Sequence, residues 1–175
     1  MIAALTGFMA SGKTTFGRAA AEQLGWTFVD LDERITETYG TPAGIFAAQG
    51  EARFREIESA ALEDAIRNAL AATDPTVLAL GGGTVLREEN LLLIREHATL
   101  IWLDTAFDII LSELGNADRP LLHGRTPAQI RDLYEARRPL YAAAADYVFP
   151  ITSTDYVQVI LDLTDFIKAL DSQHA

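Results

Sequence analysis

The stretch Gly7-Phe8-Met9-Ala10-Ser11-Gly12-Lys13-Thr14 matches the pattern of a phosphate-binding loop, in which a glycine is followed after four residues by Gly-Lys-Thr. A short apolar run at residues 2–5 precedes this stretch, and a helix-forming segment follows it. Strand, turn and helix in this order direct backbone N–H groups and a helix N-terminus toward a bound phosphate, while the lysine reaches the β and γ oxygens. The sequence therefore predicts nucleotide binding.

The loop also predicts individual contacts and a metal ion. We expect nucleotide contacts from the six residues at its end, Ala10, Ser11, Gly12, Lys13, Thr14 and Thr15. The hydroxyl of Thr14 occupies the position that holds Mg²⁺ in such loops, so Mg²⁺ with ATP is the expected ligand. A turn that merely contains glycines is the alternative, but with only two lysines in the chain a chance match to the full pattern is rare.

Length and composition predict a single domain over residues 1–175, because a chain of this size with 49% hydrophobic residues can bury one substantial core. The absence of cysteine excludes disulfides and thiolate catalysis, and three scattered histidines favour an oxygen-bound metal. The net charge of −11 disfavours a nucleic-acid partner. With neither a basic leader nor a long apolar segment, we expect no membrane partner and interpret the chain as a cytoplasmic monomer.

Five short apolar runs alternate with helical stretches long enough for crossovers, at residues 2–6, 27–29, 76–80, 99–103 and 147–151. This alternation predicts an α/β fold of three layers, with a five-stranded parallel sheet and helices on both faces. The last helix is expected to pack on the sheet through the series Tyr156, Ile160, Leu163, Ile167 and Leu170. The glycine- and proline-bearing stretch 115–127 is long enough to form a lid.

Carboxylates and glycines follow two of the predicted strands. Asp30 and Asp32 end the second strand, and Gly81, Gly82 and Gly83 follow the third. Open parallel sheets bind ligands at this carboxyl edge. One carboxylate is then available for Mg²⁺ and the other for a substrate hydroxyl, although a helix cap would explain Asp32, and a flexible turn the glycines, without any chemistry.

Two predicted helices carry charges on their apolar faces. In the helix from Glu51, Arg55 and Glu58 lie three residues apart within the apolar sector, and Arg137 lies in the apolar stripe of the helix over residues 128–145. A buried unpaired charge is costly. Arg55 and Glu58 therefore form a structural ion pair or share an anionic ligand. Arg137 forms a core salt bridge or binds a carboxylate or phosphate.

Taken together, these motifs resemble those of the shikimate kinases, P-loop kinases of aromatic amino-acid biosynthesis, over about residues 2–165. The family's phosphate loop is matched by residues 7–14, with Ala10 where a further glycine is usual, and its Asp-x-Asp pair by Asp30 and Asp32. Its other motifs are matched in order by Gly50, Glu51, Phe54, Arg55, Glu58, Gly81-Gly82-Gly83, Arg119-Pro120-Leu121-Leu122, Tyr134, Arg137, Leu140 and Tyr141.

The resemblance implies the P-loop kinase fold and ATP-dependent phosphorylation of the 3-hydroxyl of shikimate. It implies a substrate-binding region over about residues 32–60, and shikimate contacts from Asp32, Phe46, Phe54, Arg55, Glu58, Gly81, Gly82, Gly83 and Arg137. Thr14 and Asp30 would hold Mg²⁺, Asp30 through water. Catalysis would fall to Lys13, to Asp32 and to Arg119, which a lid over about residues 112–126 would bring to the nucleotide as an arginine finger.

Two points stay open. The arginine that lies on adenine in this family is replaced by Ser112, and residues 152–155 contain no arginine, so the resemblance does not assign the adenine contacts. A P-loop kinase for another polyol acid such as gluconate, or a nucleotide-binding switch without catalysis, is the alternative function. A nucleotide acceptor would need more cations, and a switch would leave Arg55 and Arg137 unexplained.

Overall fold

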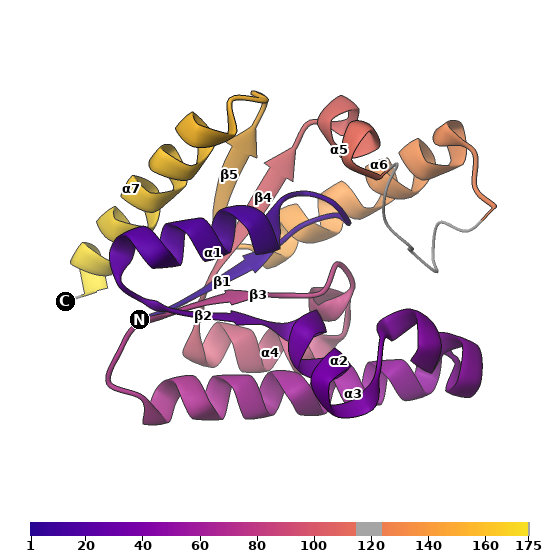
Figure 1. Cartoon of the computed structure of the whole chain (residues 1–175), viewed down its shortest axis with the longest axis horizontal. Coiled ribbons are helices and arrows are strands. Elements are labelled where there is room, and N and C mark those ends of the chain that lie inside the picture. The colour runs from indigo at the N-terminus through magenta and orange to yellow at the C-terminus, as the bar shows by residue number, and fades with distance from the viewer. Residues whose placement is uncertain (115–123, 175) are drawn as a thin grey trace.

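A computed structural model of the chain describes residues 1–114 and 124–174 (Figure 1). In this part of the chain, five parallel strands form one sheet in the order β2-β3-β1-β4-β5. The strands are β1 Ile2–Thr6, β2 Thr27–Asp30, β3 Thr76–Ala79, β4 Thr99–Thr105 and β5 Tyr147–Ile151. The predicted parallel sheet is therefore confirmed.

Helices cover both faces of the sheet, which confirms the three predicted layers (Figure 1). The helices are α1 Lys13–Leu24, α2 Leu31–Tyr39, α3 Pro42–Ala71, α4 Glu88–His97, α5 Phe107–Leu114, α6 Pro127–Ala144 and α7 Tyr156–His174, with a short 3₁₀ turn, η1 Thr84–Leu86. One buried cluster joins Phe16 of α1 and Leu163 of α7 to the sheet. A second cluster joins Ile57 of α3, Ile94 of α4 and Ile130 of α6 to it.

Local sequence explains how the two helices with charged apolar faces begin. The helix α3 is interrupted at Gly50, whose φ of 81° lies in the left-handed region, so the helix predicted from Glu51 is a separate segment. A capping box starts α6: the side chain of Thr126 accepts a hydrogen bond from the Gln129 backbone, and the Gln129 side chain accepts one from the Thr126 backbone.

The strand order places the predicted site residues at one edge of the sheet. The central strand β1 pairs with β3 on one side and with β4 on the other. The chain thus adds strands first on one side of β1 and then on the other. In open parallel sheets the point where the strand order reverses leaves a crevice at the carboxyl ends of the strands, where ligands bind. The phosphate-binding loop follows β1, Asp30 ends β2, and the glycines 81–83 follow β3, so all three meet at this crevice.

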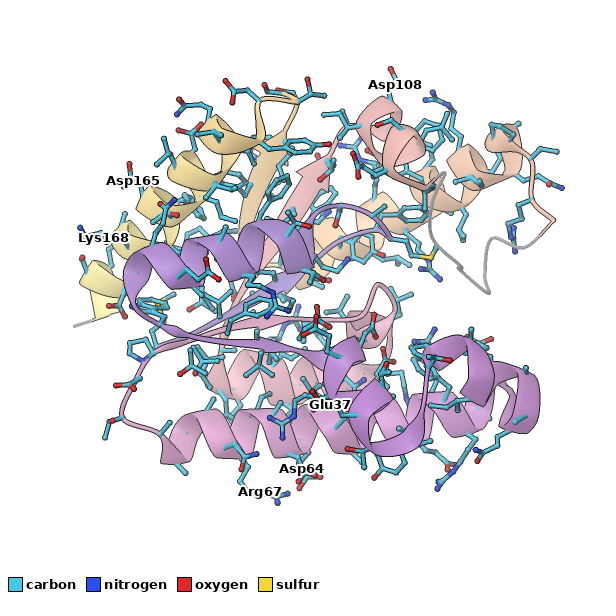
Figure 2. The ribbon with its side chains drawn as sticks, in the orientation of Figure 1. Glu37, Asp64, Arg67, Asp108, Asp165 and Lys168 are labelled. Atoms are coloured by element: carbon cyan, nitrogen blue, oxygen red, sulfur yellow. The ribbon has the colours of Figure 1, made fainter. Side chains whose placement is uncertain are left out.

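Charged side chains lie on the outer surfaces of the helices. Figure 2 shows Asp64 and Arg67 on α3, and Asp165 and Lys168 on α7, pointing away from the sheet. Asp64 and Arg67 form an exposed ion pair of 3.0 Å. Among the described helices, none is both long enough and apolar enough to cross a membrane.

Candidate active site

The phosphate-binding loop connects β1 to α1 and requires glycine at both ends. Gly12 has a φ of 89°, and a Cβ at this position would collide with the ring of Phe16. Gly7 has a φ of 147°, and a Cβ there would lie 2.8 Å from the carbonyl oxygen of Leu103. Between them, Ala10 has a φ of 60°. This left-handed conformation costs a residue with a Cβ about 1–2 kcal/mol.

The ammonium group of Lys13 is held against this loop. Its Nζ donates hydrogen bonds to the carbonyl oxygens of Gly7 at 3.0 Å and Phe8 at 2.9 Å. The hydroxyl of Thr105, at the end of β4, donates to the carbonyl oxygen of Ser11 at 2.9 Å and ties the loop to the neighbouring strand. The loop thus keeps a cation beside the N-terminus of α1, an arrangement suited to phosphate oxygens.

Thr14 and Asp30, the predicted metal-binding residues, contact each other. Thr14 Oγ1 donates to Asp30 Oδ2 at 2.6 Å, and Asp30 Oδ1 accepts from the backbone N–H of Glu33 at 3.1 Å. Asp30 is therefore the N-cap of α2. The capping role considered for Asp32 was wrong, because β2 continues through Asp30 and places Asp32 in the first turn of the helix.

The chemistry of this pair fits Mg²⁺. Hydroxyl and carboxylate oxygens are hard ligands, and Mg²⁺ usually takes one or two carboxylates together with substrate phosphates and water. Within residues 1–114 and 124–174, no three His, Cys, Asp or Glu side chains gather to hold a metal by themselves. Thr14 and Asp30 are thus suited to a metal ion that is also bound by the nucleotide.

The ion pair between Arg55 and Glu58, one of the two predicted alternatives, is present. Arg55 Nη1 lies 2.7 Å from Glu58 Oε2, and the Glu58 side chain is 1% exposed. Thr84 Oγ1 donates to the other carboxylate oxygen, Glu58 Oε1, at 2.8 Å. Burial lowers the pKa of Arg55, but the carboxylates of Glu58 and Glu51 outweigh it and raise this pKa above its ordinary value. The pair thus fixes a charged guanidinium in place.

The glycines after β3 pack closely against these charged groups. A Cβ on Gly81 would lie 2.6 Å from Glu58 Oε1 and 3.3 Å from Asp32 Oδ1. A Cβ on Gly83 would lie 2.6 Å from Arg55 Nη1. At Gly81 and Gly83 a larger residue would therefore displace the charged ends of Glu58 and Arg55, whereas a Cβ on Gly82 would meet no atom closer than 3.5 Å.

Arg137 of α6 lies beside the glycines that follow β3. Its Nη1 lies 3.4 Å from the carbonyl oxygen of Gly82, which also accepts a hydrogen bond of 2.6 Å from the hydroxyl of Tyr141. In the part of the chain that the structure describes, no carboxylate forms an ion pair with Arg137. The core salt bridge considered as the alternative is therefore not found there.

These groups line one cavity of about 540 Å³ that extends from the phosphate-binding loop to α3 and α6. It brings together all the predicted site residues that the structure describes: Ala10, Ser11, Gly12, Lys13, Thr14, Thr15, Asp30, Asp32, Phe46, Phe54, Arg55, Glu58, Gly81, Gly82, Gly83 and Arg137. Arg119 lies outside the described residues, as does most of the lid predicted over residues 112–126.

The cavity also has walls that the sequence analysis did not assign. Phe16, Ile109, Glu113 and Tyr156 line it, whereas Tyr156 was predicted only to pack on the sheet. The Tyr156 hydroxyl donates to Glu113 Oε1 at 2.6 Å. The two residues lie 43 positions apart, and no local motif joins them.

A P-loop fold whose cavity joins the phosphate-binding loop to a pocket with two arginines and a carboxylate defines a kinase of small molecules. The family model for shikimate kinase matches residues 9–168, and the chain belongs to the shikimate kinase family. A shikimate kinase of Moorella thermoacetica is 43% identical over 82% of each chain. One of Chromobacterium violaceum is 39% identical, over 97% of this chain and 90% of its own.

Solved structures agree with this assignment. The shikimate kinase of Acinetobacter baumannii in complex with shikimate superimposes with a TM-score of 0.85 at 30% identity. The likeness covers 96% of this chain and 93% of the other. The fold is thus shared over almost the whole length of both chains.

Proposed function

We infer that this protein is an ATP-dependent kinase that transfers the γ-phosphoryl group of ATP to the 3-hydroxyl of shikimate, forming shikimate 3-phosphate. The observation that carries this conclusion is the single cavity in which a phosphate-binding loop adjoins two arginines and a carboxylate. Membership of the shikimate kinase family identifies the acceptor.

The acceptor end of the cavity matches the groups of shikimate, a small carboxylate with three hydroxyls. We propose that Arg55 and Arg137 bind the carboxylate, because a guanidinium can donate two parallel hydrogen bonds to it. Asp32 accepts from a hydroxyl. The rings of Phe46 and Phe54, with centroids 4.7 Å apart, pack against the carbon ring.

At the nucleotide end, the Lys13 ammonium group gives up its hydrogen bonds to the carbonyl oxygens of the loop and binds the β and γ oxygens of ATP instead. The backbone N–H groups of the loop hold the phosphates. Thr14 and Asp30 would hold Mg²⁺, which neutralises charge on the β- and γ-phosphates when bound. Asp32 orients the acceptor hydroxyl and takes up its proton late, because phosphoryl transfer passes through a loose transition state. The assignment of Arg119 as an arginine finger rests on the sequence alone.

We further propose a cytoplasmic monomer with no nucleic-acid or membrane partner. The net charge of −11 supports the absence of a nucleic-acid partner, because phosphate backbones are bound by basic faces. Use of ATP is compatible with the cytoplasm. Gel filtration with light scattering would test the monomer.

The test is ADP release from Mg-ATP with shikimate, quinate, gluconate or AMP as acceptor, together with identification of the phosphorylated product. We expect turnover that depends on shikimate. Preferential turnover of gluconate would point to the alternative polyol-acid kinase. Nucleotide binding without turnover of any acceptor would point to a switch module.

A further inference from the structure

The cavity has a second end, opposite the acceptor groups. In the function proposed above, Lys13 and Thr14 bind the terminal phosphates at the start of α1, and Arg55 of α3 and Arg137 of α6 bind the acceptor; all four residues line this cavity. Ile109 and Glu113 of α5 and Tyr156 of α7 also line the cavity, and these helices lie on the other side of the loop from α3 (Figure 1). We therefore expect the ribose and base of the nucleotide to extend toward α5 and the start of α7. This inference rests on the function proposed above.

The walls of this second end are suited to a flat aromatic ligand. Phe16 of α1, Ile109 of α5 and Tyr156 of α7 line it from three helices. The Phe16 and Tyr156 rings meet edge to face, with centroids 5.4 Å apart and an interplanar angle of 73°. This contact fixes the Tyr156 ring, and bases readily stack on such aromatic surfaces.

Glu113 is the polar group of this end. It follows Ile109 by one helical turn and so lies on the same face of α5. Ser112, which stands where the family has its adenine-contacting arginine, does not line the cavity, and its hydroxyl donates to the carbonyl oxygen of Ile109 at 2.7 Å. The short hydrogen bond from Tyr156 holds Glu113 Oε1 and also raises the pKa of Tyr156 above its ordinary value.

We propose that Glu113 and Tyr156 form the base-recognition site of this enzyme, in place of the arginine that the family uses. The Tyr156 ring packs against the purine, and the Glu113 carboxylate accepts a hydrogen bond from the 6-amino group of adenine. An ionised carboxylate only accepts hydrogen bonds. It therefore favours an amino group at this position over hydrogen, and disfavours an oxo group, which is itself an acceptor.

The test compares ATP with purine riboside triphosphate, which lacks the 6-amino group, and with inosine triphosphate, which carries an oxygen there. For the unaltered enzyme we expect KM for purine riboside triphosphate to exceed that for ATP about tenfold or more, as for loss of a hydrogen bond to a charged group. KM for inosine triphosphate should be higher still. In the Glu113→Ala variant the KM for ATP should rise until it lies within about twofold of the same variant's KM for purine riboside triphosphate.

Asp108→Ala is the matched control. Asp108 lies on the same helix α5, but its side chain is 93% exposed and points away from the molecule (Figure 2). This variant should keep the nucleotide preference of the unaltered enzyme. Tyr156→Leu retains an apolar side chain beside Phe16 but loses the stacking surface, so KM should rise about tenfold for ATP and purine riboside triphosphate alike.

Equal preference for the amino and deamino nucleotides in the unaltered enzyme would overturn the proposal, as would a Glu113→Ala variant whose preference is unchanged. In both cases shikimate-dependent turnover with ATP would leave the proposed function standing. If shikimate were not phosphorylated at all, the proposed function would fail. Calorimetric binding of ADP and purine riboside diphosphate to the same variants would still decide the base site.

Discussion

The hydroxyl of Thr84 donates a hydrogen bond of 2.8 Å to the carboxylate of Glu58, a side chain that is 1% exposed. The carbonyl oxygen of Thr84 accepts in turn from Asn90 Nδ2 at 3.0 Å. Because the second carboxylate oxygen of Glu58 holds Arg55 at 2.7 Å, Thr84 acts through Glu58 on the position of a guanidinium that we propose binds substrate.

Thr84→Val should therefore impair shikimate binding. The variant loses the donor to Glu58, which leaves a buried carboxylate oxygen without a partner and lowers stability by about 1–3 kcal/mol. We expect KM for shikimate to rise about fivefold, and KM for ATP to change little. Thr84→Ser retains the hydroxyl and should restore KM. A lower Tm with an unchanged KM would mean that Thr84 only stabilises the fold.

Arg137→Lys should raise KM for shikimate by about tenfold or more, because lysine keeps the charge but loses the planar pair of donors. KM for ATP should stay nearly constant. Arg138→Lys is the control, since Arg138 pairs with Asp104 at 2.6 Å and does not line the cavity. Equal effects of the two substitutions on KM would contradict the assignment of Arg137 to the substrate carboxylate.

Asp32→Asn should lower kcat by about a hundredfold or more. The amide orients the acceptor hydroxyl of shikimate less well than the carboxylate does, and it cannot take up the proton of that hydroxyl. The rate loss should persist at high pH. Recovery of the rate under alkaline conditions would indicate a simple base role. Glu33→Gln, next in the chain, changes a side chain that pairs with Arg18 outside the cavity and should keep kcat.

Ala10→Gly should stabilise the protein. Glycine relieves the left-handed strain at this position, which stabilises the folded state by about 1–2 kcal/mol. Glycine also gives the unfolded chain more conformational freedom, which reduces this stabilisation by about 0.4–1 kcal/mol. We expect Tm to rise by about 1–4 °C in calorimetry. Gly12→Ala, which places a Cβ against Phe16, should lower Tm instead. A lower Tm for Ala10→Gly would show that the strain is absent.

The sequence allowed the parallel sheet to be predicted because apolar runs and helix periods are local properties. The residues at which the strands end were harder to predict. The strand β2 extends one residue beyond its apolar run, since Asp30 pairs with Ala79, and β4 extends two, since Thr105 pairs with Ile151. These pairings depend on neighbours in the sheet, so the apolar run of a single strand does not reveal them.

The described part of the cavity was largely predictable for a similar reason. Motifs such as the phosphate-binding loop, or a charge such as Arg137 on an apolar face, can be recognised within a few residues. Tyr156 and Glu113 carry no such signal, because a tyrosine at the start of an amphipathic helix is normally a packing residue. Only the order of the strands brings α5 and α7 together.

The carboxylate of Asp30 joins two parts of the site, since Oδ1 caps α2, which carries Asp32, and Oδ2 meets Thr14. A rigid carboxylate cannot shift one oxygen without the other. If Asp30 holds a metal ion as proposed above, a shift of Oδ2 toward the ion would also move Oδ1 and so act on the first turn of α2, which carries Asp32. Thermodynamic linkage makes such an effect reciprocal: whatever factor the metal-nucleotide adds to the affinity for shikimate, shikimate must add to the affinity for the metal-nucleotide.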